Sequence, residues 1–238
     1  MNYQEIYYNA YLSDLVYLHQ NSVDKFLKGK EGASVRFNDD NDHYIHFRKE
    51  SKVYVTIKGT SNLENVIYDL EYKKVFNNLL NCWVHEGFFK TSKKIYEDLI
   101  KIYSPEDEIH LTGHSYGGAV AAILGMLLKN SHYKVHQIIT FGQPKVTNDE
   151  GCKYFDKLPL IRVIHHNDPV TTVPPHTPWS WFDHGFYKHF GTMVRIKKDL
   201  SVDIAKNGSI SFWHYLSKLK LDDHRMNHYL KVCKKLTK

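Results

Sequence analysis

The chain is poor in cysteine and has no long apolar run. Only three of its 238 residues are cysteines, Cys82, Cys152 and Cys233, and no C-x-x-C pair occurs. This excludes the usual zinc and dithiol redox motifs, and such an odd, scattered set does not predict a disulfide framework. The longest apolar run, residues 119–128, has about half the length that a membrane-spanning helix requires.

The N-terminal segment lacks the pattern of a secretory signal. Its first twenty residues contain Glu5 and Asp14 but no lysine or arginine ahead of an apolar core. We therefore expect a cytoplasmic protein. Export by a route that needs no cleaved signal is the alternative.

Long blocks of charge and metal-binding motifs are also missing. The net charge of +6 is spread along the chain in short lysine pairs, which form no basic stripe with interleaved aromatic residues. Nucleic-acid binding is therefore not expected, whereas the basic surface is compatible with contact with an anionic lipid interface. The sixteen histidines include no H-E-x-x-H motif, so neither a metal site nor a cofactor is predicted.

Apolar strand patterns alternate with helical patterns along most of the chain. Runs of β-branched and aromatic residues predict strands at 35–37, 44–47, 53–57, 109–111, 135–141, 160–164 and 190–196. Helical periodicity predicts helices at 3–19, 86–103, 119–128, 210–219 and 223–236. This alternation favours an α/β fold with a central, mostly parallel β-sheet flanked by helices. No repeat or linker interrupts it, so we expect a single domain.

Residues 109–119 are the most informative stretch. A short apolar strand, a G-x-S-x-G turn centred on Ser115 and a helix of small residues follow one another. This order is typical of a nucleophile elbow, a sharp strand-to-helix turn that presents a serine. The N-terminus of the helix supplies main-chain N–H groups that stabilise a developing oxyanion. The alternative is a glycine-rich turn with an incidental serine.

A nucleophilic serine needs a general base and an acid that orients the base, in the chain order serine, acid, histidine. Asp168 ends the predicted strand 160–164 and precedes a proline, which favours it as the acid. His224, at a predicted loop–helix junction, is the preferred base. The weaker candidates are Asp156, Asp183 and Asp199 for the acid, and His214 and His228 for the base.

Two further segments suit a site of this kind. Thr60 follows the predicted strand 53–57, where this fold class places a second oxyanion donor. The alternative interpretation of this segment is that a helix begins here, with Ser61 or Asn62 as its N-cap. The segment 72–83 predicts an amphipathic helix, which is either a packed connector or a lid that turns toward lipid. Its apolar stripe consists of Val75, Phe76, Leu79, Leu80 and Trp83.

Six motifs taken together resemble the class 3 lipases, the fungal-type triacylglycerol lipases. They are residues 57–61 (IKGTS), 84–88 (VHEGF), 113–119 (GHSYGGA), 140–146 (TFGQPKV), 162–175 and 223–229. The resemblance implies an α/β-hydrolase fold with a short helical lid and a triad of Ser115, Asp168 and His224. It also implies oxyanion donors at Thr60 and the Tyr116 amide. Tyr116 itself departs from the leucine usual in the family.

The expected function is therefore a serine carboxylester hydrolase that acts on acyl-lipid esters without a cofactor. A phospholipase or a short-chain esterase with the same fold is one alternative. A lipase-like interaction module without turnover is the other.

Overall fold

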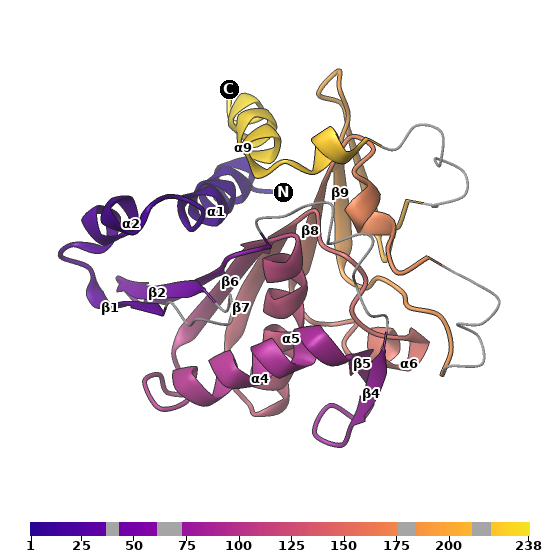
Figure 1. The fold of residues 1–238 in the computed structure, drawn as a ribbon, viewed down its shortest axis with the longest axis horizontal. Helices are drawn as coiled ribbons and strands as arrows, with labels where there is room; N and C mark the ends of the chain where they lie inside the picture. Colours follow the sequence, from indigo (N-terminus) through magenta and orange to yellow (C-terminus); the bar gives the residue numbers. More distant parts are fainter. Residues whose placement is uncertain (37–42, 61–72, 176–183, 211–219) are drawn as a thin grey trace.

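The computed structural model describes residues 1–36, 43–60, 73–175, 184–210 and 220–238. Its centre is an eight-stranded sheet in the order β1-β2-β3-β6-β7-β8-β9-β10 (Figure 1). The strands are β1 (Glu31–Arg36), β2 (Tyr44–Lys49), β3 (Lys52–Ile57), β6 (Glu108–His114), β7 (Val135–Phe141), β8 (Leu160–His165), β9 (Thr192–Ile196) and β10 (Val202–Lys206).

The middle of this sheet is parallel and its edges are antiparallel. β3, β6, β7, β8 and β9 run in the same direction, whereas β1, β2 and β10 pair antiparallel to their neighbours. Ile57 pairs with Gly113, and His114 pairs with Phe141. The carboxyl ends of β3, β6 and β7 therefore meet at one edge, which is where ligand sites form in such sheets. The predicted α/β fold is confirmed.

Helices cover both faces of the sheet (Figure 1). The helices are α1 (Tyr3–Leu15), α2 (Gln20–Leu27), α4 (Glu86–Leu99), α5 (Tyr116–Asn130), α6 (Asp149–Tyr154) and α9 (Met226–Lys235). Because strand side chains alternate between faces, Leu111 packs into the core around α5, whereas the Thr112 hydroxyl lies 3.0 Å from Ser13 of α1.

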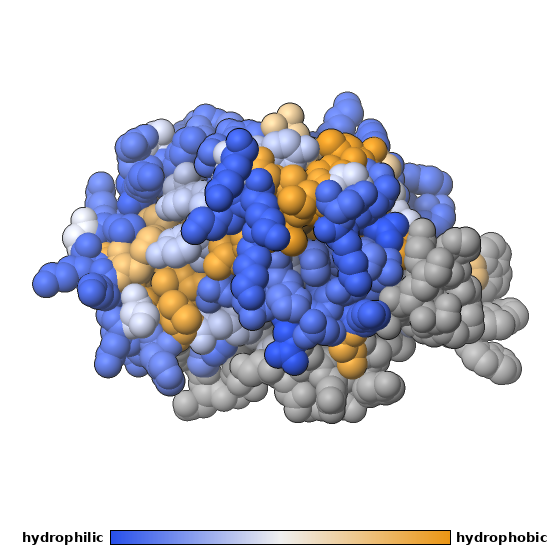
Figure 2. Space-filling view, turned by 90° about the horizontal axis from the view of Figure 1, so that it is seen from above, coloured by the Kyte–Doolittle hydropathy of each residue, from blue (hydrophilic) through white to orange (hydrophobic). Residues whose placement is uncertain are grey.

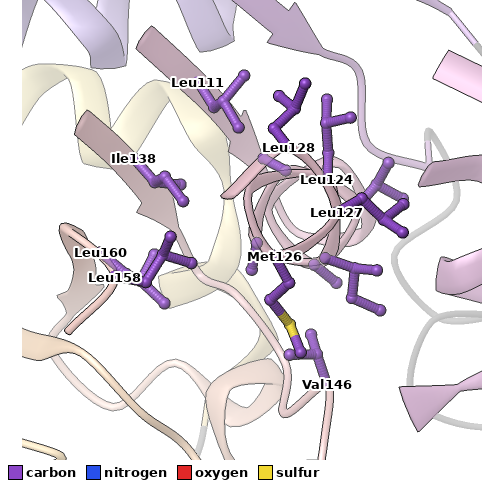
Figure 3. Close-up of a cluster of buried hydrophobic side chains, with 14 of the residues drawn as sticks. Leu111, Leu124, Met126, Leu127, Leu128, Ile138, Val146, Leu158 and Leu160 are labelled. Carbon is purple, nitrogen blue, oxygen red and sulfur yellow. The ribbon is translucent and has the colours of Figure 1, made fainter. Parts of the chain in front are cut away.

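Helix α5 is the centre of the larger core. Every residue from 117 to 128 is buried, and no charged side chain interrupts this run. Figure 3 shows side chains radiating from α5, with Leu111 of β6 and Ile138 of β7 on one side of the helix and Met126 directed toward Val146. Full burial of each large apolar side chain is worth about 1.5–3 kcal/mol, so this packing holds the start of α5 firmly against the sheet.

The opposite face is closed by α1 and α9 at the two ends of the chain. Ile6 and Ala10 of α1 pack with Met226, Tyr229 and Cys233 of α9. Figure 2, a view from above Figure 1, shows that hydrophilic side chains cover most of this side and that small apolar areas lie between them. Among the described residues, no helix is long and apolar enough to span a bilayer.

Most predicted elements are present, with shifted ends. The helix predicted at 86–103 ends at Leu99, and the one predicted at 223–236 begins at Met226, after the 3-10 turn η3 (Leu221–His224). Helix α2 and strand β10 were not predicted, so residues 190–196 are not the last strand. The helix predicted at 210–219 lies almost wholly outside the described residues, as does the helix proposed to start at Ser61 or Asn62.

The helix predicted at 72–83 is wrong. Apart from Tyr72, which lies outside the described part of the chain, the segment forms a β-hairpin of β4 (Lys74–Asn77) and β5 (Cys82–His85). The Asn77 side chain accepts a hydrogen bond of 2.9 Å from the Leu80 amide, and Asn81 has a φ of 50°. Asparagine side chains readily bond to nearby main-chain groups, and asparagine tolerates a positive φ, so both residues favour a turn. This preference determines the local structure here, although the apolar residues are spaced as in a helix.

Candidate active site

Ser115 lies on the sharp turn between β6 and α5. Its φ and ψ are 58° and −124°, a conformation that residues other than glycine rarely adopt. The Ser115 amide donates to the Phe141 carbonyl (2.8 Å), and its carbonyl accepts from the Ala119 amide (3.1 Å). The strand ladder and the helix thus hold a strained residue in place, as expected where strain serves a site.

The two glycines of the motif make this turn sterically feasible. A Cβ atom on Gly113 would lie 2.5 Å from the main-chain carbonyl of Gly117. A Cβ atom on Gly117 would collide with the carbonyl of Ile57 on β3. The helix can therefore start directly against two strands only because both positions lack a side chain.

Asp168 follows β8 and caps the 3-10 turn η1 (Pro169–Thr172). Its Oδ1 accepts from the Val170 amide (2.8 Å), and its Oδ2 accepts from His224 Nδ1 (2.7 Å) and from the Tyr229 hydroxyl (2.5 Å). The buried Lys145 donates to the carbonyls of Thr172 and Pro174 and so fixes the loop that follows. The carboxylate is therefore saturated with donors and oriented from three sides.

His224 reaches this acid from the other end of the chain. His224 is the last residue of η3. Two hydrogen bonds hold this turn against the end of β8: His165 Nδ1 donates to the Asp223 carbonyl (2.9 Å), and the Asn167 amide donates to the Asp223 carboxylate (3.3 Å). The carbonyl of His224 itself accepts a 2.7 Å bond from His114 Nε2. Main-chain contacts thus place the imidazole beside Asp168, 56 residues earlier.

The electrostatics of the pair suit proton transfer. Burial favours a raised pKa for Asp168, but the charge and hydrogen bond of His224, with the Tyr229 and Val170 donors, hold it below its ordinary value. Since the carboxylate accepts from His224 Nδ1, the Nε2 atom is left to take up a proton. His224 Nε2 and Ser115 Oγ are both buried, and neither has a hydrogen-bond partner among the described residues.

Gly142 also belongs to the site, although no role was predicted for it within the motif at residues 140–146. It follows β7 with a φ of +58°. A Cβ atom there would lie 2.6 Å from Asp168 Oδ2 and 2.7 Å from His224 Nδ1. The acid–base pair fits against the sheet because this position has no side chain. A glycine directly after an apolar strand was the available signal.

Both predicted oxyanion donors belong to segments that lie close to Ser115. Thr60 follows Gly59, where a Cβ atom would lie 3.3 Å from Ser115 Cβ. Thr60 lines a cavity of about 380 Å³ together with Tyr17, His114 and residues of the α9 start. The amide of Tyr116 is at the first position of α5, beside the serine.

The Tyr116 side chain turns away from the serine. Its hydroxyl lies 2.7 Å from Thr91 Oγ1, and its ring packs edge-on against Phe88 of α4. The departure from the family's leucine therefore alters the packing between α4 and α5.

The weaker candidates for acid and base lie elsewhere. Asp156 pairs with Lys206 at the surface, and Asp199 accepts from Ser201 within a turn. His228 lies 3.6 Å from Asp222. Asp183 and His214 lie outside the described residues. His85 accepts a bond from the Phe88 amide at the start of α4, which is a structural contact.

The five residues predicted for a helical lid or acyl pocket share no single face. Leu80 is fully buried in the core, whereas Phe76 and Leu79 are 40% and 49% exposed. Val75 packs partly against the core, and the Trp83 ring stacks on His184 at 3.4 Å. These residues are the two strands and the turn of a hairpin, so an amphipathic helical lid at this position is excluded.

A mostly parallel sheet that carries a strand–serine–helix elbow at its carboxyl edge, with a buried aspartate–histidine pair beside it, defines an α/β-hydrolase. The pattern of the family described as Lipase (class 3) matches residues 54–177, which is more than half of the chain. The chain belongs to the class 3 lipase family, and the resemblance seen in its motifs is confirmed.

Individual relatives agree with this assignment. Lipase A of Sodiomyces alcalophilus is 29% identical over 191 residues, covering 63% of this chain and 44% of that protein. Secreted mono- and diacylglycerol lipase 1 of Fusarium solani is 30% identical over 166 residues, covering 63% and 49%. The chain thus spans about half the length of the curated relatives it matches. The structure of lipase II from Rhizopus niveus superimposes with a TM-score of 0.76 at 20% identity, over 93% of this chain and 92% of that one.

Proposed function

We propose that this chain is a serine carboxylester hydrolase that acts on acyl lipids, with Ser115 as nucleophile, His224 as general base and Asp168 as the acid that orients it. The observation that carries the proposal is a buried Asp168–His224 hydrogen bond of 2.7 Å in a fold that also presents a serine on a strained strand-to-helix turn. Membership of the class 3 lipase family supports it.

In the first half of the reaction, Ser115 Oγ attacks the ester carbonyl while His224 Nε2 takes its proton. Asp168 stabilises the imidazolium that forms, because its carboxylate already accepts from Nδ1. The carbonyl oxygen becomes an oxyanion, to which Thr60 and the Tyr116 amide donate hydrogen bonds. The C–O bond then breaks, and the leaving alcohol receives the proton from His224.

In the second half, water attacks the acyl-enzyme. His224 removes a proton from the water as the water oxygen bonds to the acyl carbon. The second tetrahedral intermediate then collapses: the bond between the acyl carbon and Ser115 Oγ breaks, His224 returns the proton to Oγ, and the carboxylic acid is released. Each step uses only the protein groups named here and water, so the chemistry requires no cofactor.

The substrate class follows from the relatives and the site. One relative carries the name of a mono- and diacylglycerol lipase, which suits a glycerol ester as substrate. Ser115 has no exposed surface in this conformation, so an ester reaches its hydroxyl only after the surrounding chain moves. Contact with a lipid interface is part of the proposal.

A fluorophosphonate probe tests the nucleophile directly, because it phosphonylates activated serines. We expect the probe to label the wild-type chain and Ser22→Ala, whose serine is exposed on α2, but not Ser115→Ala. Equal labelling of wild type and Ser115→Ala would overturn the proposal. So would a folded wild-type chain that is never labelled, which would favour an interaction module.

A substrate panel tests the lipid class. Rates on triolein, monoacylglycerol, phosphatidylcholine and p-nitrophenyl butyrate separate a lipase from a phospholipase and from a short-chain esterase. We expect glycerol esters to be hydrolysed faster than the phospholipid. Hydrolysis of the soluble butyrate alone would contradict acyl-lipid specificity while leaving the serine mechanism intact.

A further inference from the structure

Two histidines and a glutamate gather at the amino-terminal ends of β6 and β7. Glu108 and His110 are two residues apart on β6, so their side chains point to the same face of the sheet. His136 comes from the adjacent strand β7. Ser115 follows the other end of β6, about 20 Å away at roughly 3.3 Å per residue. The cluster is therefore separate from the candidate active site.

The donor atoms of the three side chains are close together. Glu108 Oε1 lies 3.1 Å from His110 Nε2 and 3.6 Å from His136 Nδ1. All three ligand atoms lie within 4.8 Å of one another. Donors bound tetrahedrally at about 2.1 Å from an ion lie about 3.4 Å apart, so the two measured distances bracket the required spacing. Only the two imidazoles need to approach each other.

Glu108 and His110 are held on the same strand, β6, whereas His136 comes from β7. The His110 imidazole is buried and stacks on Tyr54 of β3 at 5.0 Å. The β6–β7 register shifts between Ile109 and His110, where a regular ladder would pair His110 with His136. A bulge of this kind re-aims a side chain, and here the His136 side chain is 47% exposed to solvent.

The three side-chain types suit a cation. Neutral imidazoles and an ionised carboxylate are the forms that bind a metal ion. Near neutral pH, an ordinary carboxylate is ionised and an ordinary imidazole is mostly neutral. This set of ligands can therefore bind a cation under ordinary conditions.

We propose that Glu108, His110 and His136 form a binding site for a divalent transition-metal ion of the Zn²⁺ class. Two imidazoles and a carboxylate match the ligand preference of such ions, whereas Mg²⁺ and Ca²⁺ prefer oxygen donors alone. Because one side of His136 is exposed to solvent, water can occupy the remaining coordination positions of the ion. The ion would tie β6 to β7 at the amino-terminal edge of the sheet. No sequence motif announces the site because its ligands come from two strands.

One neighbouring charge competes with the ion. Lys134 Nζ lies 3.7 Å from Glu108 Oε2, the second oxygen of the same carboxylate. Its side chain is 59% exposed and can swing into solvent when a metal ion binds through Oε1. The competing view is that these residues form only a cluster of hydrogen bonds and charges.

Calorimetric titration of ZnCl₂ into the untagged, chelator-treated full chain decides between the two. We expect one ion per chain, with Glu108→Gln and His136→Ala each weakening binding by roughly tenfold or more, as expected for loss of a direct ligand. Neither change removes a core side chain. The control is His19→Ala, whose exposed histidine lies outside the cluster and whose affinity should match wild type.

Two further readouts do not depend on hydrolysis. Co²⁺ bound at the site should give a visible absorption band that His136→Ala lacks. Zn²⁺ should raise the unfolding temperature of wild type and of His19→Ala, but not of His136→Ala. Absence of stoichiometric binding by wild type would overturn the proposal, as would binding that survives both cluster substitutions. None of these outcomes depends on Ser115, so the proposal fails or stands apart from the proposed hydrolase.

Discussion

The imidazole of His114 donates a hydrogen bond of 2.7 Å from Nε2 to the main-chain carbonyl of His224. Because that carbonyl can only accept, His114 Nδ1 must accept in turn, and the Tyr17 hydroxyl lies 2.9 Å from it. The Gly59 amide donates to the same hydroxyl. One chain of hydrogen bonds therefore links the loop of Thr60, the turn that follows α1, the elbow strand and the candidate base.

Burial, with the nearby His224, lowers the pKa of His114 to about 3, so this imidazole stays neutral over the working pH range. It keeps one tautomer and one orientation, which suits a residue that positions another. We therefore expect His114 to position His224 through the main chain of that residue.

Tyr17→Phe tests this positioning. The substitution keeps the ring packed against His114, at 5.8 Å between centroids, but leaves the buried Nδ1 atom without its donor. Leaving such an atom unsatisfied costs about 1–3 kcal/mol, so we expect a lower free energy of unfolding in urea. We also expect kcat for ester hydrolysis to fall more than KM rises. Tyr11→Phe, at an exposed site on the preceding helix α1, is the control. Wild-type kcat in Tyr17→Phe would show that the network does not position His224.

Gly142→Ala tests the close fit of the acid–base pair against the sheet. The new methyl group would lie 2.6 Å from Asp168 Oδ2 and 2.7 Å from His224 Nδ1, so one of the two must move. A misplacement of about 1 Å costs on the order of 100-fold in rate, and we expect a loss of this size in kcat/KM for p-nitrophenyl butyrate.

The matched control is Gly29→Ala. Gly29 has a φ of +79°, and nothing lies within 4 Å of the position of its Cβ atom. Both substitutions impose the left-handed strain of roughly 1–2 kcal/mol, but only Gly142→Ala adds the clash. Comparable rate losses in the two variants would attribute the effect to backbone strain rather than to contact with the pair.

Local patterns were sufficient for the parallel strands of the central sheet and for the elbow. β7 and β8 are largely apolar runs, and the spacing of glycines around Ser115 indicates a turn that needs small residues. Asp168 was found because it directly follows such a run. In each case the residues that form the sequence pattern lie within about ten positions of one another, and so do the residues whose interactions produce the local structure.

Contacts between distant segments could not be found in this way. Tyr17 meets His114 across 97 positions, and nothing in the pattern of α1 distinguishes it from the other tyrosines. Gly142 matters because of two side chains that approach from 26 and 82 residues away in sequence. The pairing of Glu108 with His136 depends on a register shift between strands. Such relationships exist only once the sheet is assembled.

The hairpin at residues 74–85 places two adjacent leucines in different environments, so we expect their substitution to affect stability differently. Leu80 is fully buried, so Leu80→Ala should lower the free energy of unfolding by about 2–5 kcal/mol. Leu79 is exposed in the turn, so Leu79→Ala should change it by no more than about 0.5 kcal/mol. An amphipathic helix would place both on one stripe. Similar losses for the two variants in urea unfolding would therefore contradict the hairpin.

Tyr229→Phe tests how Asp168 is kept ionised. Asp168 has a folded pKa below its ordinary value of 3.8, so its contribution to stability is fully present above that pH and is lost as the pH falls through the folded pKa. Removing the Tyr229 hydroxyl takes one donor from the carboxylate and raises the folded pKa toward 3.8. The stabilisation should therefore be smaller in the variant, and its loss should be complete at a higher pH than in wild type.

The measurement is the free energy of unfolding in urea at a series of values between about pH 3 and pH 7, for wild type, Tyr229→Phe and the exposed control Tyr154→Phe. At neutral pH we expect Tyr229→Phe to be less stable by about 1.5–3 kcal/mol, the value of a hydrogen bond to a charged group. This difference in unfolding free energy between wild type and Tyr229→Phe should decrease at the lowest pH values, because protonation of Asp168 removes the charge that the hydroxyl stabilises. A gap that stays constant with pH would mean that the hydroxyl contributes packing or a neutral bond only. Asp168 would then be kept ionised by His224 and Val170 alone.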